Sequence, residues 1–249
     1  MKALLRWLVL VLVAAAALQV FFLARIALPA SVDPQSTSFQ RSEAWRLLTQ
    51  KGQLRWRQQW MPYQDISDHL KRAVIASEDG SFTNHDGVDW EAVEKAWQRN
   101  AQAEERAERA ASRKPQQVAP ARAAKPLKIV GGSTITQQLA KNLLLSGERT
   151  LLRKGQEFIL AFALERMLSK ERILEIYLNS VEWGEGVFGA EAAAQHYYRK
   201  SASRLSAYEA ARLAVMLPRP KYFEKLPNSG YLASRASTIV ARMRDADLP

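Results

Sequence analysis

Residues 131–142 read Gly131-Gly132-Ser133-Thr134-Ile135-Thr136-Gln137-Gln138-Leu139-Ala140-Lys141-Asn142, a stretch in which two glycines lead into hydroxyl and amide side chains. Thr134, followed three residues later by Gln137, is typical of a capping box, in which each side chain bonds the backbone N–H of the other residue. Helical spacing then places four polar side chains on one face, those of Thr134, Gln137, Gln138 and Lys141. The stretch therefore predicts a helix with a polar face and an aliphatic core face.

The polar face of this helix has two interpretations. Unpaired N–H groups at a helix start, with Lys141 one to two turns later, favour an anion such as a phosphate. An ordinary amphipathic helix with a good cap explains the same residues without a ligand. The stretch alone leaves both open.

The composition of the chain points to an anionic partner. Its 249 residues carry a formal net charge of +11, and the pI is about 10.0. Nucleic acid, an acidic membrane surface and a phosphorylated substrate all suit such a charge. The basic residues are scattered, which argues against nucleic acid. The absence of cysteine excludes disulfides, thiolate metal sites and cysteine nucleophiles.

The N-terminus predicts a membrane anchor. Residues 7–24 are apolar except for Gln19, and at 1.5 Å per residue they span about 27 Å, enough for a slightly thin bilayer core. We predict one retained transmembrane helix within 1–28, because no clean small-x-small cleavage site follows the apolar run. Lys2 and Arg6 precede it, which favours a cytoplasmic N-terminus.

The segment 29–61 is polar, and its tryptophans alternate with arginines. Such a mixture suits a jaw at the membrane interface. It also suits a juxtamembrane linker that packs its tryptophans on the following domain. Both readings rest on the same residues, Trp45, Trp56 and Trp60 with Arg46, Arg55 and Arg57.

The remainder, 62–249, predicts one mostly α-helical domain. Three of its predicted helices are preceded by a serine that can cap the helix N-terminus, namely Ser67, Ser169 and Ser206. The apolar run 158–168 predicts a helix buried on nearly all sides. Residues 98–128 are rich in Ala, Arg, Glu, Gln and Pro, and predict a mobile or partly helical insertion that is net basic and lies outside the core. The alternative for that insertion is an arm for an anionic polymer or lipid surface.

The letters Gly184-Glu185-Gly186-Val187-Phe188-Gly189 match a dinucleotide fingerprint. That fingerprint requires a buried strand before it and a βαβ unit around it, whereas this one follows a predicted helix in a chain with almost no strand-like alternation. We therefore predict a tight turn that lets two helices approach.

Three groups of side chains are candidates for chemistry. They are Glu78 with Asp79, the polar face of 133–141 with Arg149, and Glu157 with Arg153 and Lys154. Two carboxyls suffice to hydrolyse a glycosidic bond. The cations are needed only if the leaving group is itself anionic, as a pyrophosphate is, and one carboxylate would then deprotonate the attacking hydroxyl.

Five motifs occur in order between about residues 62 and 223. They are Glu78-Asp79-x-x-Phe82-x-x-His85-x-Gly87, Gly132-Ser133-Thr134-Ile135-Thr136-Gln137-Gln138 through Lys141-Asn142, Arg153-Lys154-x-x-Glu157, Ile173-Leu174-Glu175-x-Tyr177-Leu178-Asn179, and Gly184-x-Gly186-x-x-Gly189 running into Ala192-Ala193-Ala194. In these motifs the chain resembles the monofunctional biosynthetic peptidoglycan glycosyltransferases, family 51, whose domain also begins the class A penicillin-binding proteins. The insertion at 98–128 departs from that pattern, since the family usually keeps this region short.

The resemblance implies a lysozyme-like, mainly α fold with a membrane-touching jaw, and polymerisation of lipid II with no room for a transpeptidase domain. It implies that Glu78 is the general base and that Glu157 assists at the pyrophosphate, with Mg²⁺ or Mn²⁺ allowed at Glu157 and no organic cofactor. Substrate binding falls to Ser133, Thr134, Gln137, Gln138, Lys141, Asn142, Arg149, Arg153 and Lys154. Structural roles fall to Asp79, Phe82 and His85, of which His85 is equally a candidate substrate contact.

The implied partners are lipid II, the growing glycan strand, membrane lipid and other cell-wall synthesis and division proteins, with no nucleic acid. The implied location is the bacterial cytoplasmic (inner) membrane, crossed once, with the catalytic domain on the periplasmic face. Two rivals stay open. One is a lytic transglycosylase or lysozyme, which cleaves finished glycan, and the other is a catalytically silent scaffold.

Overall fold

The computed structural model describes residues 2–112, 132–145, 147 and 150–249. Its elements are, in chain order, α1 (Lys2–Ala27), η1 (Leu28–Ala30), α2 (Ser38–Lys51), β1 (Arg57–Gln58), η2 (Tyr63–Asp65), α3 (Asp68–Glu78), η3 (Phe82–Asn84), α4 (Trp90–Ser112), α5 (Ile135–Leu144), α6 (Leu151–Met167), α7 (Lys170–Ser180), β2 (Glu182–Gly184), β3 (Val187–Phe188), α8 (Ala190–Tyr198), η4 (Ala202–Arg204), α9 (Ala207–Met216), α10 (Pro220–Phe223), α11 (Gly230–Arg242) and η5 (Met243–Asp245). The predicted mainly α class is confirmed.

The chain divides into two compact units, 1–88 with 134–249, and 89–133. The smaller unit contains α4, which begins where Asp89 Oδ1 accepts a hydrogen bond from the Ala92 N–H at 2.7 Å. The first part of the predicted insertion, 98–112, is therefore helical. Its continuation through 128 lies outside the described residues.

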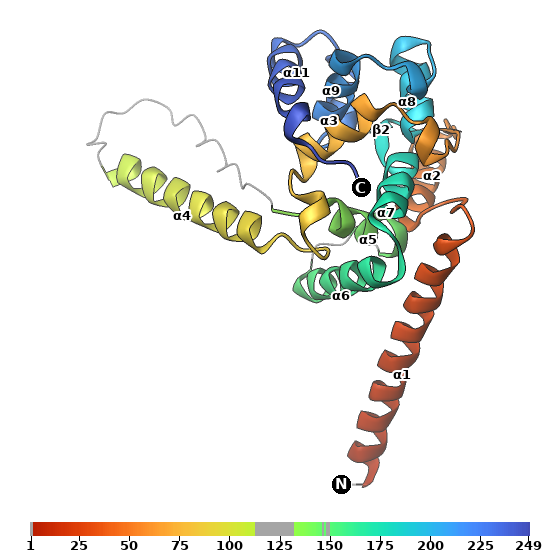
Figure 1. Ribbon diagram of the computed structural model, residues 1–249. Coiled ribbons are helices and arrows are strands. Elements are labelled where there is room, and N and C mark those ends of the chain that lie inside the picture. The colour runs from red at the N-terminus through yellow and green to blue at the C-terminus, as the bar shows by residue number, and fades with distance from the viewer. Residues whose placement is uncertain (1, 113–131, 146, 148–149) are drawn as a thin grey trace. The chain divides into compact units, whose positions relative to one another are not determined.

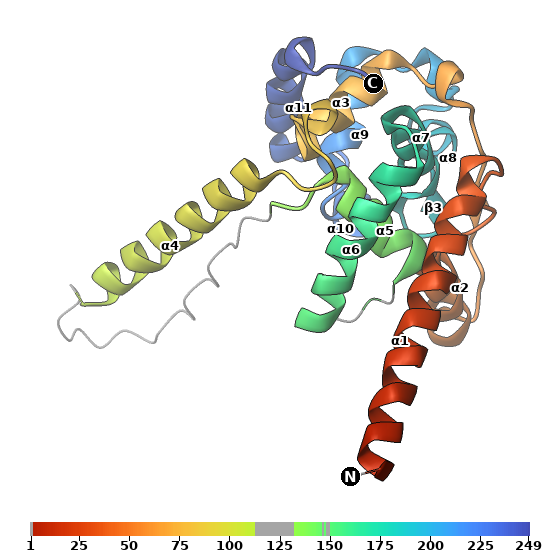
Figure 2. The same cartoon turned by 60° about the horizontal axis from the view of Figure 1, so that its bottom comes forward.

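The core of the larger unit is built from helices that pack in two groups. In one, α3 lies against α9 and α11; in the other, α5 lies among α2, α6 and α7. Figures 1 and 2 show the first group at the top of the ribbon and α5 with α6 below it. The serine caps predicted from sequence are confirmed, because Ser67, Ser169 and Ser206 each accept a backbone N–H at the start of α3, α7 and α9.

Helix α1 is long and apolar enough to cross a membrane, as the sequence predicts. Most of its length is exposed, but its last turns belong to the folded body, where Phe22 and Ile26 are buried. The candidate membrane span therefore continues directly into the core.

The segment 29–61 is folded rather than free. It contains α2 and β1, and Gln40 on α2 donates to the Ser180 carbonyl at 3.1 Å. The Trp56 ring lies 4.7 Å from that of Phe188, and Trp60 packs against the core. Trp45 is exposed. Two of the three tryptophans thus follow the packing interpretation, while for Trp45 the membrane-interface interpretation stays a prediction.

The prediction that the helix over 158–168 is buried on nearly all sides is wrong. Helix α6 packs on α5 through a narrow stripe that includes Leu160 and Leu164. Leu151 is 93% exposed and Leu152 87% exposed, and Ile159 and Phe162 are exposed as well. Apolar composition cannot distinguish a helix covered by protein from one that faces lipid, and such an exposed patch marks a binding or membrane surface.

The glycine-rich letters also form a different structure from the one predicted. They lie in a small sheet of order β1-β3-β2, with β2 antiparallel and β1 parallel to β3. Gly186 turns between two strands, not between two helices. Gly189 does lie between two helices. It is the N-cap residue of α8, and it approaches α7 so closely that an added Cβ would lie 2.7 Å from the Asn179 carbonyl oxygen.

Gly186→Ala should destabilise the protein by about 2 kcal/mol. Gly186 has φ +72°, and an added Cβ would lie 2.0 Å from the Arg55 carbonyl oxygen, so β1 would have to leave β3. Urea unfolding in detergent measures the change. Gly155→Ala is the matched control, since it lies within α6 with open space around it, and alanine there should stabilise by several tenths of a kcal/mol. Equal effects at both glycines would contradict the steric argument.

Candidate active site

Asp79 joins the end of α3 to the start of α5. Its Oδ2 accepts the Ile135 N–H at 2.9 Å, and its Oδ1 lies 2.9 Å from His85 Nε2. His85 Nδ1 accepts the Gly87 N–H at 3.1 Å, so the ring proton is on Nε2 and points to Asp79. Both ring nitrogens of His85 are thus engaged within the protein, which favours the structural role over a substrate contact. Asp79 connects this loop to α5, and its role in holding the loop stays a prediction.

The predicted capping box is confirmed. Thr134 Oγ1 accepts the Gln137 N–H at 3.1 Å, and Gln137 Oε1 accepts the Thr134 N–H at 3.2 Å. Thr134 also donates to the Gly87 carbonyl at 2.6 Å, and Gln137 is only 1% exposed. The predicted polar face therefore has two parts. Thr134 and Gln137 form the cap, whereas Gln138 and Lys141 take no part in it.

Gln138 is the side chain of α5 that reaches Glu78. Its Nε2 donates to Glu78 Oε2 at 3.0 Å, and its Oε1 accepts from the Tyr177 hydroxyl at 2.9 Å. Tyr177 is fully buried, and burial raises the pKa of its phenol well above the usual value, with Glu78 and Asp79 adding to the shift. The phenol thus remains a donor. It fixes the Gln138 amide in the orientation that presents an N–H to an ionised carboxylate.

Burial is also the largest influence on Glu78, and it raises the pKa of this carboxyl. The neighbouring Asp79 charge acts in the same direction, while hydrogen bonds from Gln138 and Ser77 and the charge of Lys141 act against it. In its ionised form, a carboxylate with a raised pKa is a stronger proton acceptor than an ordinary exposed one. A buried carboxylate of this kind is suited to accept a proton, and the role of general base stays a prediction for Glu78.

A second cluster lies on α6. Glu157 is 3% exposed, and its two oxygens meet Arg153 Nη1 at 2.8 Å and Lys154 Nζ at 2.5 Å. Arg153 Nε is buried and, among the described residues, has no acceptor. Buried donors are normally satisfied, so an oxygen from a bound anion is the natural partner for this one. The cluster carries one carboxylate and two cations.

This cluster does not provide a metal site as it stands. Both oxygens of Glu157 are engaged by cations, which repel a divalent ion. In the described part of the chain, no three His, Asp or Glu side chains are grouped to hold a metal. Mg²⁺ or Mn²⁺ at Glu157 stays a prediction from sequence, and no chemical step below passes through a metal.

The remaining predicted residues occupy varied positions. Lys141 is exposed on α5, and Asn142 beside it is buried. Ser133 lies directly before the Thr134 cap. Phe82 is fully buried under the Lys170 ammonium, which is 4.5 Å from its ring centroid. Arg149 lies outside the described residues.

Helix α5 connects the two clusters, because Gln138 bonds Glu78 while α5 packs along α6. Tyr177 is not among the site residues predicted from sequence, although it lies within one of the five motifs. A tyrosine in an aliphatic helical stripe needs a partner for its hydroxyl when it is buried. That requirement is the signal that would have singled it out.

Comparisons with known proteins give one family. A family model described as Transglycosylase matches residues 46–127 and 122–244. A biosynthetic peptidoglycan transglycosylase of Burkholderia thailandensis is 52% identical over 233 residues, which cover 94% of this chain and 82% of that protein. A protein of the same name from Bordetella pertussis is 52% identical over 217 residues, 87% of this chain and 82% of its own. Another from Herminiimonas arsenicoxydans is 48% identical over 250 residues, 100% and 99% of the two chains.

Proposed function

The chain belongs to the transglycosylase family, and we propose that this lysozyme-like peptidoglycan transglycosylase polymerises lipid II into glycan strands. The growing strand, linked to undecaprenyl pyrophosphate, would be the glycan donor, and the 4-hydroxyl of the next lipid II the acceptor. The observation that carries the proposal is the buried Glu78 carboxylate, held by Gln138 at the start of α5. A protein that serves only as a scaffold binds its partners through its surface and does not require a buried carboxylate.

We assign Glu78 as the general base. The acceptor 4-hydroxyl gives its proton to the Glu78 carboxylate as its oxygen attacks the anomeric carbon of the glycan donor. The bond from that carbon to the pyrophosphate breaks, and its electrons leave on the pyrophosphate oxygen. Because attack and departure occur on opposite faces, the α linkage becomes β. A positioned base of this kind contributes roughly 10²- to 10⁴-fold to the rate.

We assign the leaving pyrophosphate to the cationic cluster on α6. Charge develops on the departing oxygen, and fixed cations stabilise it without reorganisation. The unsatisfied Arg153 Nε supports this placement, and Glu157 holds Arg153 and Lys154 in a fixed geometry. Binding of donor phosphates and sugar would extend to Ser133, Gln138, Lys141, Asn142 and Arg149, with Thr134 and Gln137 acting through the shape of the α5 cap.

The membrane is where this substrate must be met. A polyprenyl tail keeps lipid II in the bilayer, and the chain offers the apolar span of α1 and the exposed apolar side chains of α6. We propose that α1, within 1–28, crosses the cytoplasmic membrane once and that 62–249 forms the catalytic domain on the periplasmic face. Cell-wall synthesis and division proteins are the protein partners that such a location supplies.

One experiment tests this function against hydrolysis and against a silent scaffold. Purified full-length protein is incubated with lipid II, and separately with isolated cell-wall sacculi, with and without a chelator. We expect lipid II to be consumed and polymer to form. Soluble muropeptides from sacculi would instead indicate a lytic enzyme, and no change in either substrate a scaffold. The chelator arm, run also on Glu157→Gln, tests the predicted cation.

Tyr177→Phe should lower kcat about fivefold, the worth of one net hydrogen bond. Without the phenol, Gln138 no longer holds its N–H toward Glu78. Because that hydrogen bond lowers the pKa of Glu78, its loss should move the acidic limb of the pH–rate profile to higher pH. Lipid II polymerisation across pH measures both effects. The control is Tyr198→Phe, because the Tyr198 hydroxyl donates to the Glu209 carbonyl instead. An equal effect in that variant would contradict the proposed action of Tyr177 on Glu78 through Gln138.

A further inference from the structure

The anchor helix carries one polar side chain within its apolar run, Gln19, and this side chain meets α6. Gln19 Nε2 donates to Gln156 Oε1 at 3.0 Å, and Gln156 Nε2 donates to Gln19 Oε1 at 3.0 Å. The two amides thus close a reciprocal pair. An amide in a membrane span is costly unless it is satisfied, and paired amides hold helices together there.

The body fixes the upper end of α1 as well. Phe22 and Ile26 are buried in the core. Arg172 of α7 donates from Nε to the Pro29 carbonyl and from Nη2 to Asp33, both at 2.8 Å. The anchor is therefore held at two levels, the amide pair and the Arg172 contacts, about 15 Å apart along the helix. It does not join the body through a free tether.

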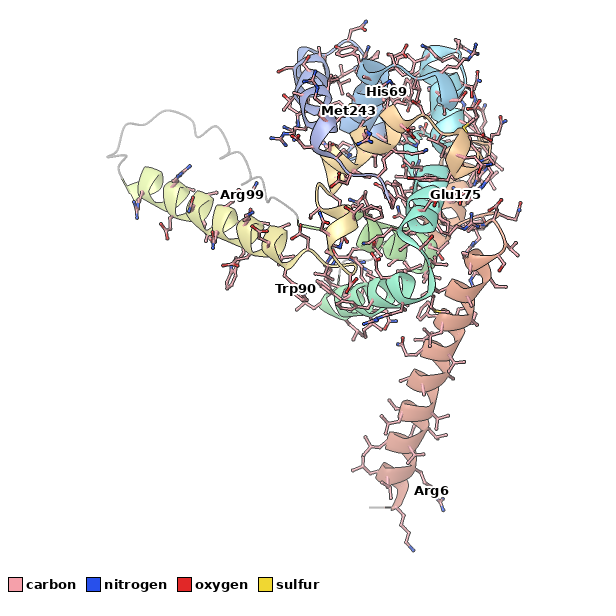
Figure 3. All side chains as sticks on the ribbon, viewed as in Figure 1. Arg6, His69, Trp90, Arg99, Glu175 and Met243 are labelled. Carbon is pink, nitrogen blue, oxygen red and sulfur yellow. The ribbon has the colours of Figure 1, made fainter. Side chains whose placement is uncertain are left out.

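The amide pair is adjacent to the chemistry. Gln156 directly precedes Glu157, whose carboxylate binds Arg153 and Lys154. Figure 2 shows α1 leaving the body beside α6, and Figure 3 shows Arg6 near the other end of α1. A rigid anchor that touches α6 one residue from this cluster transmits its own depth and rotation to the cluster.

We propose that Gln19 and Gln156 are positioning residues that lock α6 onto the anchor, so that the membrane sets the depth of the Arg153–Lys154–Glu157 cluster. The proposal rests on the proposed function, since the pyrophosphate of a lipid-linked donor lies at a fixed depth. Breaking the pair lets α1 leave α6 and lowers the fraction of enzyme that can bind the donor. That loss raises KM and leaves kcat, which is measured at saturation, nearly unchanged.

Cross-linking tests the contact itself. The chain has no cysteine, so full-length Gln19→Cys/Gln156→Cys in lipid vesicles has only the engineered thiol pair. We expect a disulfide after mild oxidation, seen as a mobility shift on a non-reducing gel. Val20→Cys/Gln156→Cys is the control, because Val20 is 65% exposed and faces about 100° away at nearly the same depth. Equal cross-linking in both pairs would overturn the proposal.

Kinetics in the same vesicles test the positioning role. The pair contains two hydrogen bonds, and each shifts an equilibrium by roughly fivefold. Gln19→Leu should therefore raise KM for lipid II by roughly fivefold to twentyfold, with kcat within about twofold. The oxidised double-cysteine variant should recover the wild-type KM, and its reduction should raise KM again. The KM of Gln19→Cys alone should not change when the oxidant is added. A merely structural role would not give this reversible KM change.

The outcomes separate the two proposals. An unchanged KM in Gln19→Leu, or no redox response in the double variant, would overturn the positioning role. The proposed function would be overturned if the wild-type protein did not polymerise lipid II. Specific cross-linking of Gln19→Cys/Gln156→Cys would still support the docked anchor in that case.

Discussion

Glu78→Gln should reduce lipid II polymerisation by roughly 10²- to 10⁴-fold, the contribution of a positioned general base. The amide is isosteric with the carboxylate and retains a contact with Gln138, so substrate binding should persist. The effect should therefore appear in kcat rather than in KM. Glu171→Gln, an exposed position on α7, is the matched control and should retain activity. Full turnover in Glu78→Gln would remove Glu78 from the base role.

The pH dependence of the wild type follows from the same carboxyl. The base acts only when ionised, and burial raises its pKa above the ordinary 4.5. Polymerisation should therefore fall as the pH drops, with a midpoint above 4.5, and the slower residual reaction of Glu78→Gln should lack that limb. A midpoint at or below 4.5 would contradict the buried environment.

The same substitution should stabilise the fold. Because the folded-state pKa of Glu78 is raised, its contribution to stability is fully present below the unfolded pKa and is lost as the pH rises through the folded pKa. Gln carries no charge to bury, so the inactive variant should unfold at higher urea than wild type at neutral pH, with the difference vanishing in acid. This opposition between activity and stability is expected where a site demands a buried charge.

The sequence predicts the parts of this site that depend on local spacing. The Thr134–Gln137 cap and the position of Glu78 at the end of α3 follow from helix signals alone. The division of the polar face does not, because the direction of Gln138 depends on Tyr177, 39 residues away. Roles for Ser133, Lys141 and Arg149 remain predictions.

The features that the sequence did not predict correctly also depend on more than local spacing. Strands of two or three residues, such as β3 and β2, show no alternation long enough to recognise. Ile159 and Phe162, within the run 158–168, look like core residues because the hydropathy of a side chain is the same whether it is buried or exposed. The Gln19–Gln156 pair joins residues 137 positions apart. No local pattern contains that contact.

Asp79→Ala should destabilise the protein by about 4 kcal/mol, because it leaves the buried Ile135 N–H and His85 Nε2–H without an acceptor and opens a cavity. Asp79→Asn should cost about half as much. Its amide oxygen can still accept from Ile135, but its NH₂ then faces the His85 N–H. His85 cannot escape by changing tautomer, since Nδ1 would then oppose the Gly87 N–H.

Urea unfolding of full-length protein in detergent measures this series, with Asp86→Ala as the control at an exposed aspartate of the same loop. Asp79→Ala should also lose polymerising activity where the variant remains folded, because Asp79 ties the end of α3, and with it Glu78, to the start of α5. If Asp79→Asn were as stable as wild type, the fixed His85 tautomer would be wrong. If Asp79→Ala matched the Asp86→Ala control, the junction between α3 and α5 would not depend on Asp79.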